Sequence, residues 1–130
     1  SGYLRFLMLA KLRGLRPRGY RFKQEQAQIE SWLALIAEAV KHSGALALEV
    51  AECARLIKGY GDTHARGLAN YATIEARVIR PALAGVHPPR RAADATASAR
   101  TAALVDPEGQ SLAKCLAEID DPAAFRVAAE

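Results

Sequence analysis

Aromatic residues are scarce in this chain of 130 residues: they make up 6%, although hydrophobic residues as a whole make up 51%. Alanine dominates the hydrophobic fraction, and it is the best helix former and a poor strand former. No apolar run reaches the roughly 18 residues that a membrane-spanning helix needs. The length suits one domain with a core of useful size. The sequence therefore predicts an all-α protein of closely packed helices, as a single domain without a membrane span.

Cysteine is also rare, with only Cys53 and Cys115 in the chain. The two lie far apart in apolar, helix-like contexts, and neither belongs to a CxxC motif. No spacing typical of a metal, haem or iron–sulfur site is present. We therefore expect no metal site and no cofactor in this chain, and a reduced, cytoplasmic protein.

Acidic residues are absent from the first 23 positions, whereas the other 107 residues contain 11 basic and 14 acidic side chains. We expect residues 1–23 to form a basic N-terminal helix and link, and residues 24–130 to form the helical bundle. The basic part favours docking on a parent chain or partner subunit, ahead of a merely solvated face. An anionic membrane surface is a further alternative. Nucleic acid is disfavoured, since interleaved aromatic residues are few and no nucleic-acid motif is present. The basic residues are Arg5, Lys11, Arg13, Arg16, Arg18, Arg21 and Lys23.

The chain begins with Ser1 rather than methionine and enters an apolar segment, "SGYLRFLML", almost at once. The segment lacks the cleavage site of a signal peptide, and the sequence after it is too basic for one. We expect a domain excised from a longer protein, with Ser1 as a cloning remnant.

Apolar residues at helical spacing predict a bundle of about five to six helices. Pro17 and Gly19 are expected to break the chain between the first two helices. Gly44 is expected to end the second helix in a left-handed conformation. The expected helices cover residues 3–15, 22–42, 45–58, a stretch from about residue 62 until Pro81 interferes, and 90–105, with further helix starts at "DPEG" and "DDPAAF".

Two of these helices have a distinctive apolar pattern. In the second, Ile29, Trp32, Leu33, Ile36 and Val40 form one continuous stripe. The third is apolar on nearly all sides, which is typical of a central buried helix. On it, Glu49, Glu52 and Arg55 suggest a buried ion-pair network, with Glu52 and Arg55 able to pair. The apolar residues of the third helix are Leu46, Val50, Cys53 and Ile57 on one face, and Leu48 and Leu56 on another.

The stretch "RLIKGYGDTHARGLANYATI", residues 55–74, contains the candidate site. A structural interpretation accounts for residues 59–62 but not for the cationic side chains around them. Gly59 and Gly61 would allow a sharp corner between two antiparallel helices, because glycine tolerates positive φ. Asp62 or Thr63 would cap the next helix. Tyr60 would pack across the corner.

A functional interpretation adds the cationic side chains. With the backbone of Gly59 and Gly61 at a helix N-terminus, Lys58, His64 and Arg66 would suit a carboxylate or phosphate. The P-loop pattern GxxxxGK[ST] is absent, however, and an aspartate at the cap would repel an anion. His64 has no Ser, Cys or Asp at a triad-like spacing. The structural interpretation is favoured, the anion site stays open, and no catalytic residue is assigned.

Two stretches carry a family resemblance: "VAECARLIKGYGDTHARGLANYATI", residues 50–74, and "YRFKQEQAQIESWLALI", residues 20–36. They resemble the C-terminal helical region of the indolepyruvate oxidoreductase beta subunit, whose long bacterial form carries such an extension. The specific part is "LIKGYGDTHARG", and weaker similarity covers most of residues 3–120. A related glycine-aromatic-glycine turn occurs in the fused indolepyruvate ferredoxin oxidoreductases.

The resemblance implies a 2-oxoacid:ferredoxin oxidoreductase complex, which decarboxylates aryl-pyruvates such as indolepyruvate to the aryl-acetyl-CoA and passes electrons to ferredoxin. In that family, thiamine diphosphate and the iron–sulfur clusters belong mainly to the other subunit, and the upstream part of the beta subunit is a separate oxidoreductase domain. No established catalytic residue of the family maps onto this chain. The positions that match the family's signature turn are Lys58, Gly59, Tyr60, Gly61, Asp62, Thr63, His64, Arg66 and Gly67.

We therefore expect an accessory helical domain that helps assemble or position the catalytic subunits and is not catalytic alone. Its expected partners are the parent chain's upstream domain and the partner catalytic subunit. The alternative is an anion-binding module for coenzyme A phosphates or the substrate carboxylate, at the turn of residues 58–66.

Overall fold

The computed structural model describes residues 16–121, with side chains from residue 23 onwards. The chain divides into two compact units, residues 1–34 and residues 35–130, and each is considered by itself. The helix expected over residues 3–15, the side chains of the basic arm before residue 23 and the helix start at "DDPAAF" lie outside the described residues. The boundary expected after residue 23 falls inside a helix.

Every regular element within residues 16–121 is helical, which confirms the all-α class. Three short segments connect the longer helices: the 3₁₀ helix η1 (Cys53–Leu56), the π-helical segment η2 (Glu75–Ile79) and the single turn α5 (Arg80–Leu83). None of the described helices combines the length and the apolar character needed to cross a membrane. The longer helices are α2 (Arg16–His42), α3 (Gly44–Glu52), α4 (Gly61–Ile74), α6 (Pro89–Val105) and α7 (Gln110–Asp120).

Both ends of α2 differ from the prediction. The helix begins at Arg16 and continues through Pro17 and Gly19, so the break expected there is wrong. Proline fits because it lies in the first turn, where its missing N–H has no intrahelical partner to lose. At the other end, Gly44 does not take a left-handed conformation; Ser43 is extended, and its hydroxyl accepts a hydrogen bond from the Leu46 N–H at 3.3 Å. One serine thus separates α2 from α3.

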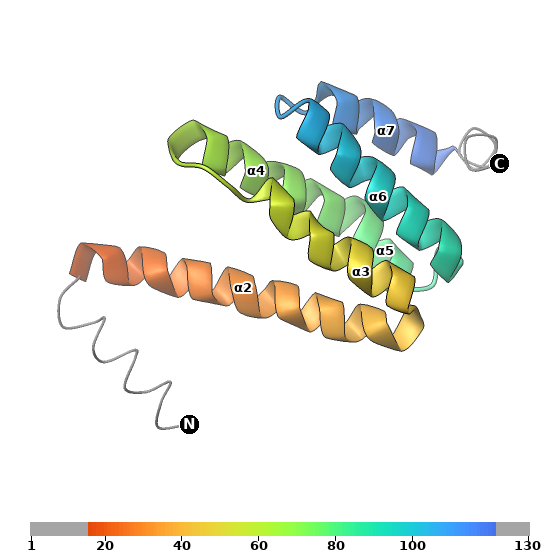
Figure 1. The fold of residues 1–130 in the computed structure, drawn as a ribbon, viewed down its shortest axis with the longest axis horizontal. Helices are drawn as coiled ribbons and strands as arrows, with labels where there is room; N and C mark the ends of the chain where they lie inside the picture. Colours follow the sequence, from red (N-terminus) through yellow and green to blue (C-terminus); the bar gives the residue numbers. More distant parts are fainter. Residues whose placement is uncertain (1–15, 122–130) are drawn as a thin grey trace. The chain divides into compact units, whose positions relative to one another are not determined.

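Within residues 35–121, α6 packs against α3 and α7 and also contacts α4 (Figure 1). Its buried face is built from small residues at helical spacing, each at most 1% exposed. Small side chains let neighbouring helices approach closely, as the alanine-rich composition suggested. The face consists of Ala92, Ala95, Ala99 and Ala103, with Thr96 beside them.

The buried faces of α2 and α3 are only partly the predicted ones. In the described end of α2, Leu35 and Ala39 are buried while Val40 is 59% exposed, so the predicted stripe does not mark the core-facing side there. Leu46 and Val50 of α3 and Cys53 at the start of η1 are buried as predicted, but Leu48 is exposed. The predicted third helix also ends early, since its last turn is the 3₁₀ segment η1. One buried stripe, rather than burial on all sides, therefore anchors α3.

The fourth helix continues past Ile74 without a break, through η2 into α5. In η2 the N–H of Arg80 donates to the carbonyl oxygen of Glu75, five residues back. A proline clashes with the carbonyl four residues before it in a regular helix, and a π-turn is one way to relieve such a conflict. The widened turn thus lets the chain stay helical through Pro81.

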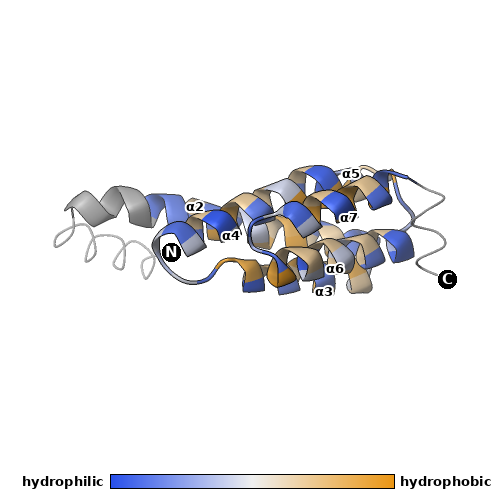
Figure 2. Cartoon of the chain, turned by 90° about the horizontal axis from the view of Figure 1, so that it is seen from above, coloured by the Kyte–Doolittle hydropathy of each residue, from blue (hydrophilic) through white to orange (hydrophobic). Residues whose placement is uncertain are grey.

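The start of α7 lies later than the Asp-Pro signal predicted. The helix begins at Gln110, after Gly109 in a left-handed conformation with φ +94°. Asp106 lies before the helix and stabilises both the turn and the helix start, because its carboxylate accepts hydrogen bonds from the N–H of Glu108 in the turn and from that of Ser111 in the first turn of α7, each at 3.1 Å. Figure 2 shows α4 and α7 with both hydrophilic and hydrophobic residues, as amphipathic helices have.

Candidate functional site

The turn between η1 and α4 has the backbone that its two glycines suggested. Gly59 has φ +79° and Gly61 has φ +58°, in the left-handed region that side chains disfavour. A Cβ atom on Gly59 would lie 2.9 Å from Cγ2 of Thr63, whereas one on Gly61 would meet nothing within 4 Å. The corner therefore favours glycine at both positions because of its backbone conformation, and a side chain at position 59 would also displace that of the exposed Thr63.

Two details of the structural interpretation are wrong. Asp62 and Thr63 lie inside the first turn of α4 and are not its cap; Tyr60 occupies that position and provides no side-chain hydrogen bond. Tyr60 does not pack across the corner either, because it is 91% exposed. Asp62 still stabilises the helix, since a negative charge in the first turn interacts favourably with the helix dipole.

The closest approach at this corner involves Gly67, whose role the sequence did not reveal. A Cβ atom there would lie 2.1 Å from the carbonyl oxygen of Leu56 and 3.6 Å from Cα of Ile57. The backbone of α4 thus rests directly on the backbone of η1, and Gly67 is buried. In the sequence, the only hint of this contact was a third glycine, Gly67, shortly after Gly59 and Gly61.

One of the cationic side chains of the candidate anion site, Arg66, is already paired with a carboxylate. Lys58 is exposed and His64 half-buried. Arg66 forms an ion pair with Glu108 at 3.5 Å, and Asn70, one turn along α4, donates to the carbonyl oxygen of Pro107 at 3.1 Å. These two side chains thus attach the loop between α6 and α7 to α4. An anion at this turn would meet the first-turn backbone of α4, and the negative charge of Asp62 in the same turn would oppose it.

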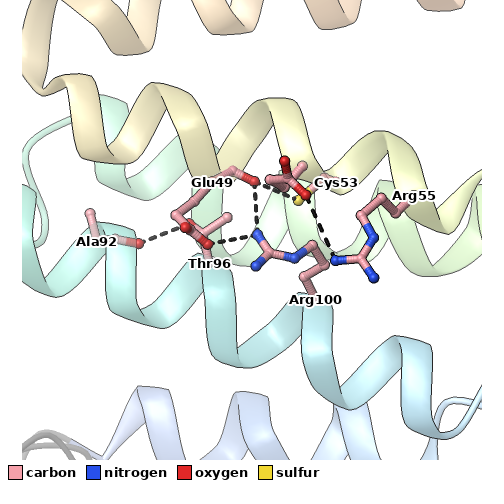
Figure 3. Close-up of polar contacts among 7 residues, drawn as sticks. Glu49, Cys53, Arg55, Ala92, Thr96 and Arg100 are labelled. Atoms are coloured by element: carbon pink, nitrogen blue, oxygen red, sulfur yellow. Dashed lines mark hydrogen bonds and ion pairs between the residues drawn. The ribbon is translucent and has the colours of Figure 1, made fainter.

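A polar cluster inside the bundle connects α3 to α6 (Figure 3). The Arg100 Nη1 donates to Oε2 of Glu49 at 2.6 Å and to its backbone oxygen at 3.2 Å. The thiol of Cys53 donates to that same backbone oxygen, and the Thr96 hydroxyl donates to the carbonyl oxygen of Ala92. Burial is the largest of the effects that raise the pKa of Cys53 to about 11, so the thiol stays protonated and unreactive.

The predicted network of Glu49, Glu52 and Arg55 is therefore divided. Glu52 and Arg55 do pair, at 3.7 Å, but on the exposed surface. Glu49 pairs instead with Arg100, 51 residues away, which helical spacing alone does not reveal.

A cavity of about 500 Å³ opens beside η2, at the end of the bundle opposite the α6–α7 loop. Arg77 is fixed at its edge by an ion pair with Asp120, with 2.6 Å between Nη2 and Oδ2. Burial, and then the charge of Arg91, lower the pKa of His87, while Asp120 acts in the opposite direction. No feature of the sequence pointed to a role for His87. The lining residues are Ala76, Arg77, Pro81, Val86, His87, Arg91, Ile119 and Asp120.

A family model described as "Family of unknown function (DUF6537)" matches residues 1–77, which is more than half of the chain. The chain belongs to the DUF6537 family. No curated protein and no solved structure matches it. The turn of residues 58–67 lies inside the part of this DUF6537 chain that the family model covers. Most of the cavity lining lies beyond that part.

Proposed function

We propose that this DUF6537 chain is an accessory helical domain of an indolepyruvate:ferredoxin oxidoreductase-like complex. The domain helps to assemble or position the catalytic subunits in the cytoplasm and is not catalytic alone. Thiamine diphosphate and the iron–sulfur clusters of such a complex belong to the other subunit. The resemblance of residues 20–36 and 50–74 motivates the enzyme class, and the geometry of the turn supports the accessory role.

The observation that carries the accessory role is the contact of Gly67 with the Leu56 carbonyl. Three glycines of the signature turn have a structural role. Gly59 and Gly61 adopt a left-handed backbone conformation, and Gly67 allows the backbone of α4 to contact that of η1. Arg66 likewise serves to attach the α6–α7 loop. A motif whose residues are used in this way is explained by folding, without a bound ligand.

Tyr60 offers a contact for the partner subunit. It lies between Gly59 and Gly61, which both have positive φ, and it is 91% exposed. Tyrosine is enriched among the residues that dominate binding energy at protein interfaces.

The second candidate function is an anion site at the same turn for coenzyme A phosphates or the substrate carboxylate. It is favoured by the absence of a side-chain cap on α4, which leaves first-turn N–H groups without a side-chain acceptor. Lys58 and Arg66 would supply charge and His64 a hydrogen bond. The ion pair between Arg66 and Glu108 and the charge of Asp62 weigh against it.

The test uses the full-length parent chain, co-expressed with its partner subunit. Deletion of this domain should abolish the complex on gel filtration, and indolepyruvate-dependent dye reduction should be lost with it. Tyr60→Ala should weaken assembly while Lys58→Ala and His64→Ala leave it intact. If the deletion leaves the complex assembled and active, the accessory role is wrong.

The two candidates separate in the kinetics of the assembled variants. An anion site predicts that Lys58→Ala and Arg66→Gln raise KM for coenzyme A or indolepyruvate. The accessory role predicts unchanged KM in Lys58→Ala, with Arg55→Gln as a matched control for loss of an exposed charge.

A further inference from the structure

The cavity beside η2 combines two kinds of wall. Apolar groups from four residues line one part of it, and Arg77, His87 and Arg91 line the rest together with Asp120. A volume of about 500 Å³ lies within the range of small-molecule sites, which are mostly apolar with a few convergent polar groups. The apolar residues are Ala76, Pro81, Val86 and Ile119.

The charged lining is positive. Its two arginines outweigh the single carboxylate of Asp120, so the formal charge is +1 with a neutral His87 and +2 when the imidazole is protonated. The ion pair with Asp120 uses one nitrogen of the Arg77 guanidinium and fixes its position. A guanidinium has five N–H donors in a fixed plane, so such a pair leaves donors for a second anion.

Local electrostatics reinforce this positive character. The first turn of α6 contains no acidic residue and carries Arg90 and Arg91. Of these two, Arg91 lines the cavity, and an anion there would interact favourably with its charge and with the positive end of the helix dipole. The lowered pKa of His87 is consistent with this positive environment, since burial and the charge of Arg91 both disfavour protonation of the imidazole.

We propose that this cavity binds a small organic carboxylate, with the carboxylate beside Arg77 and Arg91 and the apolar body against Val86, Pro81 and Ile119. The apolar walls distinguish such a ligand from inorganic phosphate, which would leave them in contact with water. The site lies mostly outside the segment matched by the DUF6537 family, and it is separate from the turn of residues 58–67. It therefore stands independently of the function proposed above.

The test is a titration of the isotope-labelled chain with sodium phenylacetate at constant ionic strength, followed by two-dimensional NMR. Phenylacetamide serves as the neutral analogue and phosphate as the anion without an apolar body. We expect saturable shifts with phenylacetate and weak or absent shifts with the other two. The amides expected to shift are those of Val86, His87, Arg91 and Ile119.

Two variants of Val86 make the test specific. The residue is 64% exposed, so substitution should leave the fold intact. Val86→Glu places a negative charge at the cavity and should weaken phenylacetate binding by roughly tenfold or more, because like charges repel in a partly desolvated site. Val86→Gln, of the same size without the charge, should weaken it much less. Arg91→Gln should also weaken binding.

Several results would overturn the proposal. Absence of saturable shifts at millimolar phenylacetate would remove the site. If phenylacetamide bound as tightly as phenylacetate, the site would not select for a carboxylate. If phosphate bound as tightly, the site would not select for an apolar body. Unchanged affinity in Val86→Glu would place the ligand elsewhere on the chain.

Discussion

Arg100 on α6 contacts both the side chain and the main chain of Glu49 on α3, at 2.6 Å and 3.2 Å. The side chains are 12% and 22% exposed, so both charges are largely removed from water. The favourable interaction between them offsets a desolvation cost that either charge alone would leave uncompensated. This pair ties two helices together that lie about 50 residues apart in the sequence.

Replacing one member of this pair should destabilise the fold. We expect Arg100→Met to lower the free energy of unfolding by roughly 2–4 kcal/mol, because Glu49 is left charged and half-buried without its partner. Urea denaturation followed by circular dichroism measures the change. Arg55→Met is the control: it breaks the exposed pair with Glu52 and should cost less than about 0.5 kcal/mol. Equal losses in the two variants would contradict the structural role of Arg100.

The glycines should respond to alanine in a graded order. Gly67→Ala should cost more than about 3 kcal/mol, because the new Cβ meets the backbone oxygen of Leu56 at 2.1 Å and the backbone cannot easily move. Gly61→Ala has free space but a positive φ, so we expect a loss of about 1 kcal/mol. Gly44→Ala, without either conflict, should be neutral or stabilise α3 by up to about 1 kcal/mol. Thermal and urea unfolding of the three variants would test the order, and a tolerated Gly67→Ala would refute the backbone contact.

Stability should fall in alkaline solution through Cys53. Its pKa rises from 9.0 to about 11 on folding, so above pH 9 the unfolded chain loses this proton before the folded one does. Fewer protons bound in the unfolded state mean that the free energy of unfolding decreases with pH, by about 1.4 kcal/mol per unit between the two values. Denaturation at pH 8, 9 and 10 measures the slope.

Cys53→Ala is the matched control, since its slope should be shallower between pH 9 and 10. The pKa of Cys115, raised mainly by burial, adds a contribution of the same sign in both proteins. Folding also raises the pKa of Tyr71, mainly through burial, so ionisation of this residue lowers stability in the same direction from about pH 10 upwards. Identical slopes in the two proteins would show that the Cys53 thiol is not protected by the fold.

The two thiols should also differ in reactivity. Cys53 is buried and Cys115 is half-buried, so dithiodipyridine should modify Cys115 first in the folded protein. Both should react in guanidinium chloride, and Cys115→Ser should make the folded chain nearly inert. Rapid modification of Cys53 in folded Cys115→Ser would contradict its burial.

His87 should titrate below its ordinary pKa of 6.5. Burial is the largest cause, and Arg91 the next, so Arg91→Gln should raise this pKa and Asp120→Asn should lower it further. Because the folded state disfavours the charged imidazole, protonation below pH 6.5 should reduce stability. NMR titration of the imidazole protons measures all three values, and an unchanged pKa in Arg91→Gln would place that arginine away from His87.

Helical class, and the existence of most helices, were predictable because alanine content and apolar spacing act along the chain. The helix expected over residues 90–105 corresponds to α6 (Pro89–Val105) within one residue. The predicted break at Pro17 failed because a proline in a first turn and one inside a helix look alike in the sequence. The π-turn before Pro81 had no sequence signal beyond the proline itself.

Contacts between distant segments account for what could not be predicted. Glu49 has no basic residue three or four positions away along its own segment, and it pairs with Arg100 on another helix. Leu48 and Val40 fit apolar patterns and are nevertheless exposed, because burial depends on which helices lie alongside. The cavity likewise joins residues 76–91 to residues 119 and 120, which become neighbours only in the folded bundle.

The alanine face of α6 gives the DUF6537 segment a physical dependence on the chain that follows it. The matched segment ends at residue 77, but the surface that shields Val50, Cys53 and Ile74 from water is completed by residues 92–103. A protein that ends at residue 77 would expose these apolar residues to water and would leave Glu49 without Arg100, its ion-pair partner. The segment that the family model matches is thus shorter than the unit that folds, and an expression boundary should follow the latter.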